Sequence, residues 1–184
     1  MVRPALRPFL TTERFDLWQP QAGDQYDLFA LTLDDETRRF LGSFTPTEMD
    51  SFNRLLRNTG SWTLYGYGVF MVRPRGAQRI IATCGVFRSH RGFGPDKGMD
   101  DVAEAGWIVH KDFWGQGVAS EVMRAALDWF DAVHGSQRIA CMIEEAHAAS
   151  DAIARKLGFV EYGRHESEDG AVLRLYERGL THLS

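Results

Sequence analysis

The sequence predicts an α/β (α+β) fold, in which a mixed and mostly antiparallel central sheet of about six to seven strands is flanked by about four helices. Two observations carry this prediction. Short stretches with strand-like alternation recur along the chain, and between them lie segments whose apolar residues repeat every three or four positions. Their order, β-α-α-β-β-β-α-β-α-β-β, places helices on both faces of the sheet.

The first part of the chain predicts one strand followed by two helices. Residues 14–20 alternate and end at a proline, whereas residues 23–33 carry apolar side chains at helical steps. Residues 45–58 predict the second helix, with Thr45 or Thr47 as its N-cap. Four apolar side chains are expected on one face of this helix: Met49, Phe52, Leu55 and Leu56.

The middle of the chain predicts a hairpin, a loop and a further strand. Residues 64–74 and 78–88 read as two strands joined by a short turn. Residues 89–101 are polar and rich in glycine, so they predict a loop long enough to carry function. The strand over residues 102–110 then leads into the next helix.

The remaining elements follow in alternation. An apolar stripe that starts at Val118 predicts a helix of about four turns. A short helix is expected over residues 150–157, where Gly158 is placed to end it. Strands are expected over residues 138–144, 159–167 and 171–179.

Composition favours one globular domain over residues 1–184. The chain is 44% hydrophobic and 12% aromatic, and no repeat or long linker divides it. We expect a cytoplasmic protein without a membrane partner, because no apolar run approaches the roughly 20 residues of a membrane span and the N-terminus lacks the apolar block of a signal peptide. A net charge of −4, with both signs mixed along the chain, argues against a nucleic-acid partner.

The two cysteines predict neither a disulfide nor a metal site. Cys84 and Cys141 lie far apart in the sequence, show no metal-ligand spacing and sit in apolar, strand-like stretches. We therefore expect two small buried thiols.

The segment "FWGQGVASEVM" (113–123) places two glycines directly before a helix. Glycine permits unusual backbone angles, and a helix N-terminus offers free N–H groups and a positive dipole end to an anion. The glycines alone fit an anion site and an ordinary strand-to-helix turn equally well. A P-loop is excluded because Val118 and Ala119 stand where its lysine and hydroxyl residue belong, and no third glycine completes a Rossmann fingerprint.

Two longer motifs decide between these interpretations. "EAGWIVHKDFWGQGVASEVM" (104–123) and "HAASDAIARKLGF" (147–159) resemble the GNAT superfamily of acetyl-CoA-dependent N-acetyltransferases, most closely its RimJ/RimL-like branch. The upstream "TTERFDLWQP" and "YGYGVFMVRPRGAQRIIATCGV" are also similar to that branch, so the resemblance covers nearly the whole chain. It implies a GNAT-like single domain, acetyl-CoA as cosubstrate and no metal.

The resemblance assigns the glycine turn to coenzyme A. Its loop would wrap the pyrophosphate through main-chain N–H groups, over Trp114, Gly115, Gln116, Gly117, Val118 and Ala119. Because Trp114 brings no charge, binding would rest mainly on backbone. Candidates for the remaining phosphate charge are Lys111, Arg124, Arg155 and Lys156.

The second motif departs from the family at two positions. The family has an asparagine where this chain has His147, and an imidazole offers one donor and one acceptor in similar space to steady the cofactor. Ser150 matches the family, and its role as a plain helix N-cap or as a cofactor or catalytic group stays open. Many members carry a tyrosine acid where Ala154 stands, so Ser150, Tyr162 or water would protonate the leaving thiolate.

The strand over residues 102–110 supplies the candidates for chemistry. The resemblance places the hydrogen bond to the acetyl carbonyl on the main chain at Ile108 and Val109. Glu104 is an acid in an otherwise apolar strand, and we predict it as the general base, directly or through a water. The alternative is a glutamate that is solvated or paired with an arginine. Weaker candidates for the base are Asp100, Asp101, His90 and His110.

The implied reaction is direct attack of a primary amine, on a protein N-terminus or a small molecule, on the acetyl group. The acceptor side would come from the first helices and the loop over residues 89–101. Two alternatives stay open: a CoA-binding regulatory module without turnover, and an acyltransferase that uses another acyl-CoA such as succinyl-CoA. A dinucleotide-binding oxidoreductase is a more distant alternative, and a homodimer stays open. The side chains expected to line the acceptor side are Phe40, Phe44, Trp62, Tyr65, Tyr67, Phe87, Arg88, His90 and Arg91.

Overall fold

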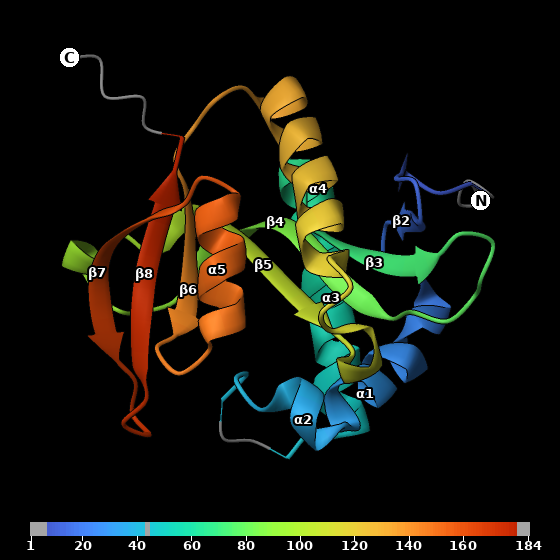
Figure 1. Ribbon diagram of the computed structural model, residues 1–184, viewed down its shortest axis with the longest axis horizontal. Coiled ribbons are helices and arrows are strands. Elements are labelled where there is room, and N and C mark those ends of the chain that lie inside the picture. The colour runs from blue at the N-terminus through green and yellow to red at the C-terminus, as the bar shows by residue number, and fades with distance from the viewer. Residues whose placement is uncertain (1–6, 43–44, 180–184) are drawn as a thin grey trace.

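The computed structural model describes residues 7–42 and 45–179, so Phe44 lies outside the described residues. These residues share an eight-stranded sheet in the order β1-β2-β3-β4-β5-β6-β8-β7 (Figure 1). Every neighbouring pair is antiparallel except β5 and β6. The predicted fold class is confirmed, with eight strands and five α-helices in the described part of the chain.

The strands and helices alternate along the chain much as the sequence predicts. The strands are β1 (Leu10–Thr11), β2 (Phe15–Trp18), β3 (Val69–Pro74), β4 (Ala82–His90), β5 (Asp100–Val109), β6 (Ile139–Glu144), β7 (Val160–Glu166) and β8 (Val172–Arg178). The helices are α1 (Gln25–Leu33), α2 (Asp35–Arg38), α3 (Glu48–Tyr65), α4 (Val118–His134) and α5 (Ala148–Lys156).

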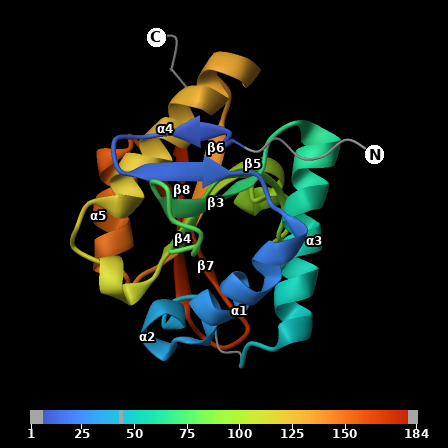
Figure 2. The same ribbon diagram turned by 90° about the vertical axis from the view of Figure 1, so that its right-hand side faces the viewer.

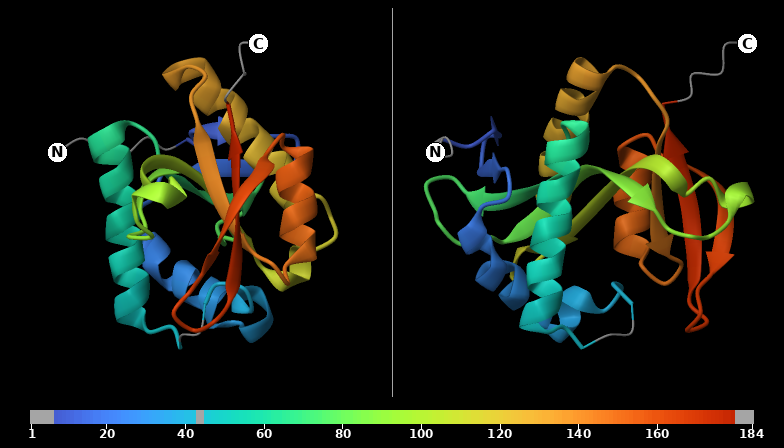
Figure 3. Two further views of the ribbon diagram at one scale, coloured as in Figure 1. Left: turned by 90° about the vertical axis from the view of Figure 1, so that its left-hand side faces the viewer. Right: turned by 180° about the vertical axis from the view of Figure 1, so that it is seen from behind.

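The helices cover both faces of the sheet. Figure 2 shows α4 and α5 on one face and α3 on the other, with α1 and α2 closing one end of the molecule. The two views of Figure 3 show the same separation. The main core lies under α4, where Val122, Met123 and Phe130 have no exposed surface.

One strand and one α-helix escape the sequence analysis, and the boundary between α3 and β3 is wrong. β1 and α2 hold two and four residues, which is too short for periodicity to show. The strand predicted from residue 64 begins at Val69, because α3 continues to Tyr65 and ends at Gly66 with a positive φ of 77°. Tertiary contacts at the end of α3 outweigh the strand propensity of its aromatic residues, since the Trp62 indole donates to the Val69 carbonyl at 3.0 Å.

The predicted apolar face of α3 is also wrong. Met49, Phe52 and Leu56 are 69%, 43% and 53% exposed, and only Leu55 is buried. The face toward the sheet carries Ser51, Leu55, Asn58 and Ser61 instead. A cavity with both polar and apolar lining lies between α3 and the sheet, so this face carries polar residues as well as apolar ones.

The strands β5 and β6 pair over only two residues. Ala103 lies opposite Ile139 and Glu104 opposite Ala140, and beyond these positions the two strands pair no further. The separation of two parallel strands in the middle of a sheet leaves backbone groups without strand partners. This separation positions the functional site.

Cys84 and Cys141 are buried free thiols, and burial raises the pKa of both. In the described residues, no helix is both long and apolar enough to cross a membrane.

Candidate functional site

A cavity of about 480 Å³ lies where β5 and β6 separate. Strands β4, β5 and β6, helices α3 and α5, and the β7–β8 turn all contribute to its lining. Four predicted site residues line it: Glu104, Ile108, His147 and Ser150. Val109 ends β5, and the turn over residues 114–117 follows it on the way into α4.

The backbone of β5 presents hydrogen-bonding groups to this cavity. The His110 N–H donates to the Ile81 carbonyl at 2.9 Å, so the even-numbered residues at this end of β5 pair with β4. The amides of Trp107 and Val109 therefore point away from β4, toward the side on which β6 has separated. An extended ligand laid along β5 can hydrogen-bond there as a further strand would.

The turn before α4 has the geometry of an anion site. Gly115 and Gly117 both adopt positive φ, at 71° and 73°, which confirms that the glycines hold unusual backbone angles. Gly117 is the N-cap of α4 and supplies no side chain to cap it. The first N–H groups of α4 are thus left for a ligand or solvent.

The side chain of Trp114 folds back from this turn. Its indole N–H donates to the Val109 carbonyl at 2.7 Å, and the side chain remains 44% exposed. The Gln116 side chain donates to the Asp112 carbonyl at 3.0 Å. These two contacts fix the turn and leave its main-chain groups accessible.

Helix α2, which the sequence analysis missed, anchors the same turn. The Lys111 N–H donates to the Thr37 hydroxyl at 3.0 Å, and the Lys111 ammonium pairs with Asp34 at 2.9 Å. The hydrogen bonds from Lys111 and from the Thr37 amide lower the pKa of Asp34 to about 2. Lys111 is thus engaged with the protein, as is Arg155 with Asp151 at 3.0 Å.

Ser150 and His147 form a hydrogen-bonded group with Trp107. The Trp107 indole donates to the Ser150 hydroxyl at 3.2 Å, and the Ser150 hydroxyl lies 3.0 Å from Nε2 of His147. His147 is the N-cap of α5, because its Nδ1 accepts from the Ser150 N–H at 3.4 Å. The interpretation of Ser150 as a plain N-cap is therefore wrong, since the histidine takes that role.

The His147 ring is held in one place. It stacks on Phe40 with ring centroids 4.1 Å apart, and burial lowers its pKa. The imidazole is therefore neutral near pH 7. Tyr162, the other candidate acid, donates to the Lys97 carbonyl at 2.7 Å and does not line the cavity.

Glu104 is buried on the cavity wall, with 2% of its surface exposed. Arg91 holds both carboxylate oxygens, at 2.8 and 2.5 Å. Glu104 is thus paired with an arginine, as the alternative interpretation expects. To act as a base as well, one of its carboxylate oxygens must also reach the substrate. The sequence analysis named Arg91 as an acceptor-side residue but not as the partner of Glu104.

The weaker base candidates are engaged elsewhere or less enclosed. Asp100 accepts from the Gly92 N–H at 2.6 Å, and Asp101 pairs with Arg88. His110 caps the short 3-10 turn after β5 by accepting from the Asp112 N–H.

The acceptor side differs in part from its predicted lining. Phe40, Phe87, Arg88, His90 and Arg91 line the cavity. The other described aromatic candidates do not line it. Trp62 packs against the core, Tyr67 is part of the core, and Tyr65 is exposed.

Four residues of α3 line the cavity without having been predicted: Arg54, Arg57, Asn58 and Ser61. The sequence signal for them is their spacing at three and four positions, which places them near one another on the helix. The choice of the apolar face of α3 as its buried face hid that signal.

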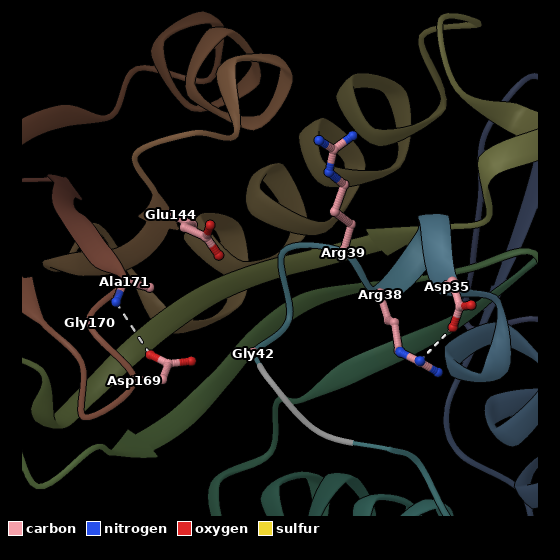
Figure 4. A pocket seen from close by; sticks show the side chains of 8 residues that line it. All are labelled: Asp35, Arg38, Arg39, Gly42, Glu144, Asp169, Gly170 and Ala171. Carbon is pink, nitrogen blue, oxygen red and sulfur yellow. Dashed lines mark hydrogen bonds and ion pairs between the residues drawn. The ribbon is translucent and has the colours of Figure 1, made fainter.

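A second hollow adjoins the mouth of the cavity and shares Gly42, Glu144, Asp169 and Ala171 with it. Figure 4 shows Arg38 turned to Asp35, with which it pairs at 2.5 Å, and Arg39 directed away from that pair. The mouth of the cavity therefore carries charges of both signs. Among the described residues, no group of three or more His, Cys, Asp or Glu side chains is placed to hold a metal ion.

Parallel strands that separate beside an uncapped glycine turn offer an extended ligand a backbone edge and a phosphate free N–H groups, and the buried carboxylate in the cavity offers a proton acceptor. Residues 14–160 match the family model described as the acetyltransferase (GNAT) domain. The chain belongs to this family, and it is an acetyltransferase that uses acetyl-CoA.

Similar proteins agree with this assignment. A putative GnaT-family acetyltransferase from Bordetella pertussis has 31% sequence identity and a TM-score of 0.81, and the match covers 92% of this chain and 98% of that one. The uncharacterized N-acetyltransferase YoaA of Bacillus subtilis is 24% identical over 160 residues, 85% of each chain. An acetyl transferase from Salmonella typhimurium, described as modifying the N-terminal serine of ribosomal protein L7/L12, shares the fold with a TM-score of 0.73 at 15% identity, over 92% of this chain and 96% of that one.

Proposed function

We propose that this protein transfers an acetyl group from acetyl-CoA to a primary amine, by direct attack with Glu104 as general base. The observation that carries the proposal is the position of Glu104. It is a buried carboxylate in the cavity that the free edge of β5 also borders. One face of β5 thus offers a proton acceptor, while its edge offers hydrogen-bond donors to a thioester.

The backbone of the protein binds the cosubstrate in this proposal. The turn from Trp114 to Ala119 wraps the pyrophosphate through the N–H groups that Gly115 and Gly117 expose. The free edge of β5 holds the extended arm beside Ile108, which lines the cavity but whose main-chain groups pair with β4, and the Val109 N–H meets the acetyl carbonyl, where negative charge develops. His147 and Ser150 line the cavity near this edge, as the Trp107 contact to Ser150 shows.

Glu104 accepts the proton that the amine loses. The amine nitrogen forms a bond to the acetyl carbon, the carbon–sulfur bond breaks, and the N–H proton passes to Glu104, directly or through a water. Arg91 fixes the position of the carboxylate through its two contacts. The thiolate that leaves takes a proton from water, or from Ser150, which regains one from solvent, and Glu104 then releases its proton to solvent.

Ser150 is placed to donate that proton. Because Nδ1 of the neutral His147 ring accepts from the Ser150 amide, its other nitrogen carries the hydrogen and donates to the Ser150 hydroxyl. The Trp107 indole donates to the same oxygen. The hydroxyl therefore accepts two hydrogen bonds, and its own hydrogen is free to point at an acceptor in the cavity.

The acceptor amine is either a protein N-terminus or a small molecule. The fold shared with the Salmonella enzyme supports the first, since that enzyme is described as modifying an N-terminal serine. The volume of about 480 Å³ supports the second, because it suits a small ligand. The fold shared with the Salmonella enzyme also supports a place for this chain in the RimJ/RimL-like branch.

A screen for thiol release tests the proposal. Purified protein with acetyl-CoA is given N-terminal peptides, polyamines and amino acids in turn, and we expect release of CoA thiol with one of these classes. Succinyl-CoA in parallel reports acyl preference. Tight binding of acetyl-CoA by calorimetry without thiol release over the whole panel would contradict the proposal and favour a regulatory CoA-binding module.

A further inference from the structure

We infer that the acceptor carries an anionic group, a carboxylate or a phosphate, on the same molecule as the reacting amine, and that Arg54 and Arg57 bind this group. The inference rests on the proposed function, because it places the amine at Glu104. It concerns the substrate class of the same cavity.

The charges on this wall of the cavity do not balance. Four arginines line it, and two of them have carboxylate partners: Arg88 pairs with Asp101, and Arg91 pairs with Glu104. Arg54 and Arg57 form no hydrogen bond or ion pair with any other residue in ranges 7–42 and 45–179. Arg54, which is half-buried, and Arg57, which is exposed, therefore line the cavity without a carboxylate in contact, while Glu144 and Asp169 line other parts of it.

The two arginines lie on the same side of the sheet as Glu104. They stand three positions apart on α3, so their side chains are neighbours on that helix. Glu104 pairs in register with Phe87, and both line the cavity with Arg57. Arg57 is close enough to Glu104 and Arg91 for its charge to interact with theirs.

The clustering of these positive charges has a cost that an anion would relieve. Burial, followed by the neighbouring guanidinium groups, lowers the pKa of Arg54 and of Arg57. A guanidinium group binds a carboxylate or a phosphate with paired, charge-assisted hydrogen bonds. The arrangement is thus prepared for an anion, even though the whole chain has a net charge of −4.

The position of the charges defines the kind of acceptor. An amine close to the Glu104 carboxylate and an anion close to Arg57 belong to one molecule that fits within this cavity, because both residues line it and their charges interact. A compact molecule with both groups fits this arrangement, and so does a peptide whose first residues are acidic. A carboxylate and a phosphate would both accept paired hydrogen bonds from the guanidinium groups, so the experiment below distinguishes between them.

Binding to the CoA-loaded protein tests the inference without requiring turnover. The probes are pairs that differ only in the anionic group: β-alanine and β-alaninamide, phosphoethanolamine and ethanolamine, and peptides that begin Asp-Glu or Asn-Gln. Calorimetry should show the anionic member of at least one pair binding about tenfold tighter or more. The pair that discriminates identifies the source of the anion.

The variants assign the preference to the two arginines. The double change Arg54→Gln with Arg57→Gln should abolish the preference, and it should leave the fold intact because neither side chain has a partner to lose among the described residues. Arg79→Gln is the matched control, because Arg79 is exposed and does not line the cavity. Equal binding within every pair, a preference that survives the double change, or no binding of any probe would overturn the inference.

The failure of this inference and that of the proposed function are distinguishable. Acetylation of neutral amines with no preference for the anionic partner would refute the inference and leave the proposed function standing. A preference for anions that depends on Arg54 and Arg57, without acetylation of any probe, would refute the proposed function alone.

Discussion

The two halves of the proposed site differ in the part of the chain that would bind. The cofactor half would consist of backbone: the turn at Gly115 and Gly117, which lies outside the lining of the cavity, and the free edge of β5. The acceptor half would consist of charged side chains from α3, β4, the loop after β4 and β5. The first half offers dipoles and N–H groups, whereas the second offers full charges.

This difference predicts how each half responds to mutation. A site made of backbone tolerates most side-chain changes and is sensitive to backbone strain. A site made of charged side chains keeps its shape after a conservative substitution and loses its chemistry. Substitutions of each kind therefore separate cofactor binding from catalysis.

The largest effect is expected from Glu104→Gln, which removes the proton acceptor and keeps nearly the same shape. We expect the rate of acetyl transfer at neutral pH to fall about 100-fold, while the affinity for CoA stays nearly unchanged. Steady-state kinetics and calorimetry measure the two quantities. Glu13→Gln is the control, because Glu13 is exposed and does not line the cavity. An unchanged rate in the Glu104 variant would rule out its role as base.

Gly117→Val should show the opposite pattern. A β-branched residue at the φ of 73° is strained, although the nearest atom to an added Cβ is 3.8 Å away on Arg14. We expect CoA affinity to fall roughly twentyfold, since a distorted turn misplaces the N–H groups.

Gly135→Val provides the matched control for this change. Gly135 ends α4 at a similar φ of 77°, at the opposite end of the helix. The control should lose stability and keep its CoA affinity. The same CoA affinity in the Gly117 variant as in the wild type would refute the backbone cradle.

Ser150→Ala tests the one hydroxyl that we assign to the chemistry. The main-chain N–H of residue 150 is unchanged in the variant and still donates to Nδ1 of His147, so the cap of α5 is kept. The loss of one hydrogen bond to a developing thiolate should lower kcat about tenfold. Ser136→Ala, at an exposed position, is the control. A wild-type kcat in the Ser150 variant would assign the proton to water instead.

The smallest effect is expected from His147→Asn, which introduces the residue typical of the family. Asparagine is a good N-cap, so the cap should survive, while the stacking on Phe40 is lost. The rate should change less than about twofold. The His147→Asn variant is more informative about the pH dependence of stability.

The sign of that dependence follows from the buried imidazole. Burial lowers the pKa of His147 in the folded protein below its ordinary value of 6.5, so the unfolded chain binds a proton first as the pH falls. The stability of the wild type should therefore decline below about pH 6.5 relative to His147→Asn. Urea unfolding at pH 8 and pH 5.5 measures this difference. Parallel pH profiles of the two proteins would show that His147 does not contribute it.

Sequence analysis succeeds where the signal is local. The stripe of α4, the glycines before it and the motif around α5 each occupy one continuous segment, and the structure confirms the helices and the backbone angles. It fails where an element is too short, as for α2, or where tertiary contacts decide, as for the exposed face of α3. That error hid Arg54 and Arg57 from the predicted acceptor side.

The sequence by itself determined the order of the elements, the glycine turn before α4 and the family to which the chain belongs, because each depends on spacing within a short segment. The tertiary structure alone decided that Arg91 holds Glu104, that His147 caps α5 while it supports Ser150, and that two arginines without partners among the described residues share their cavity. These side chains come from segments far apart in the chain. They meet because β5 and β6 separate and because α3 packs its polar face over the strands beside that opening.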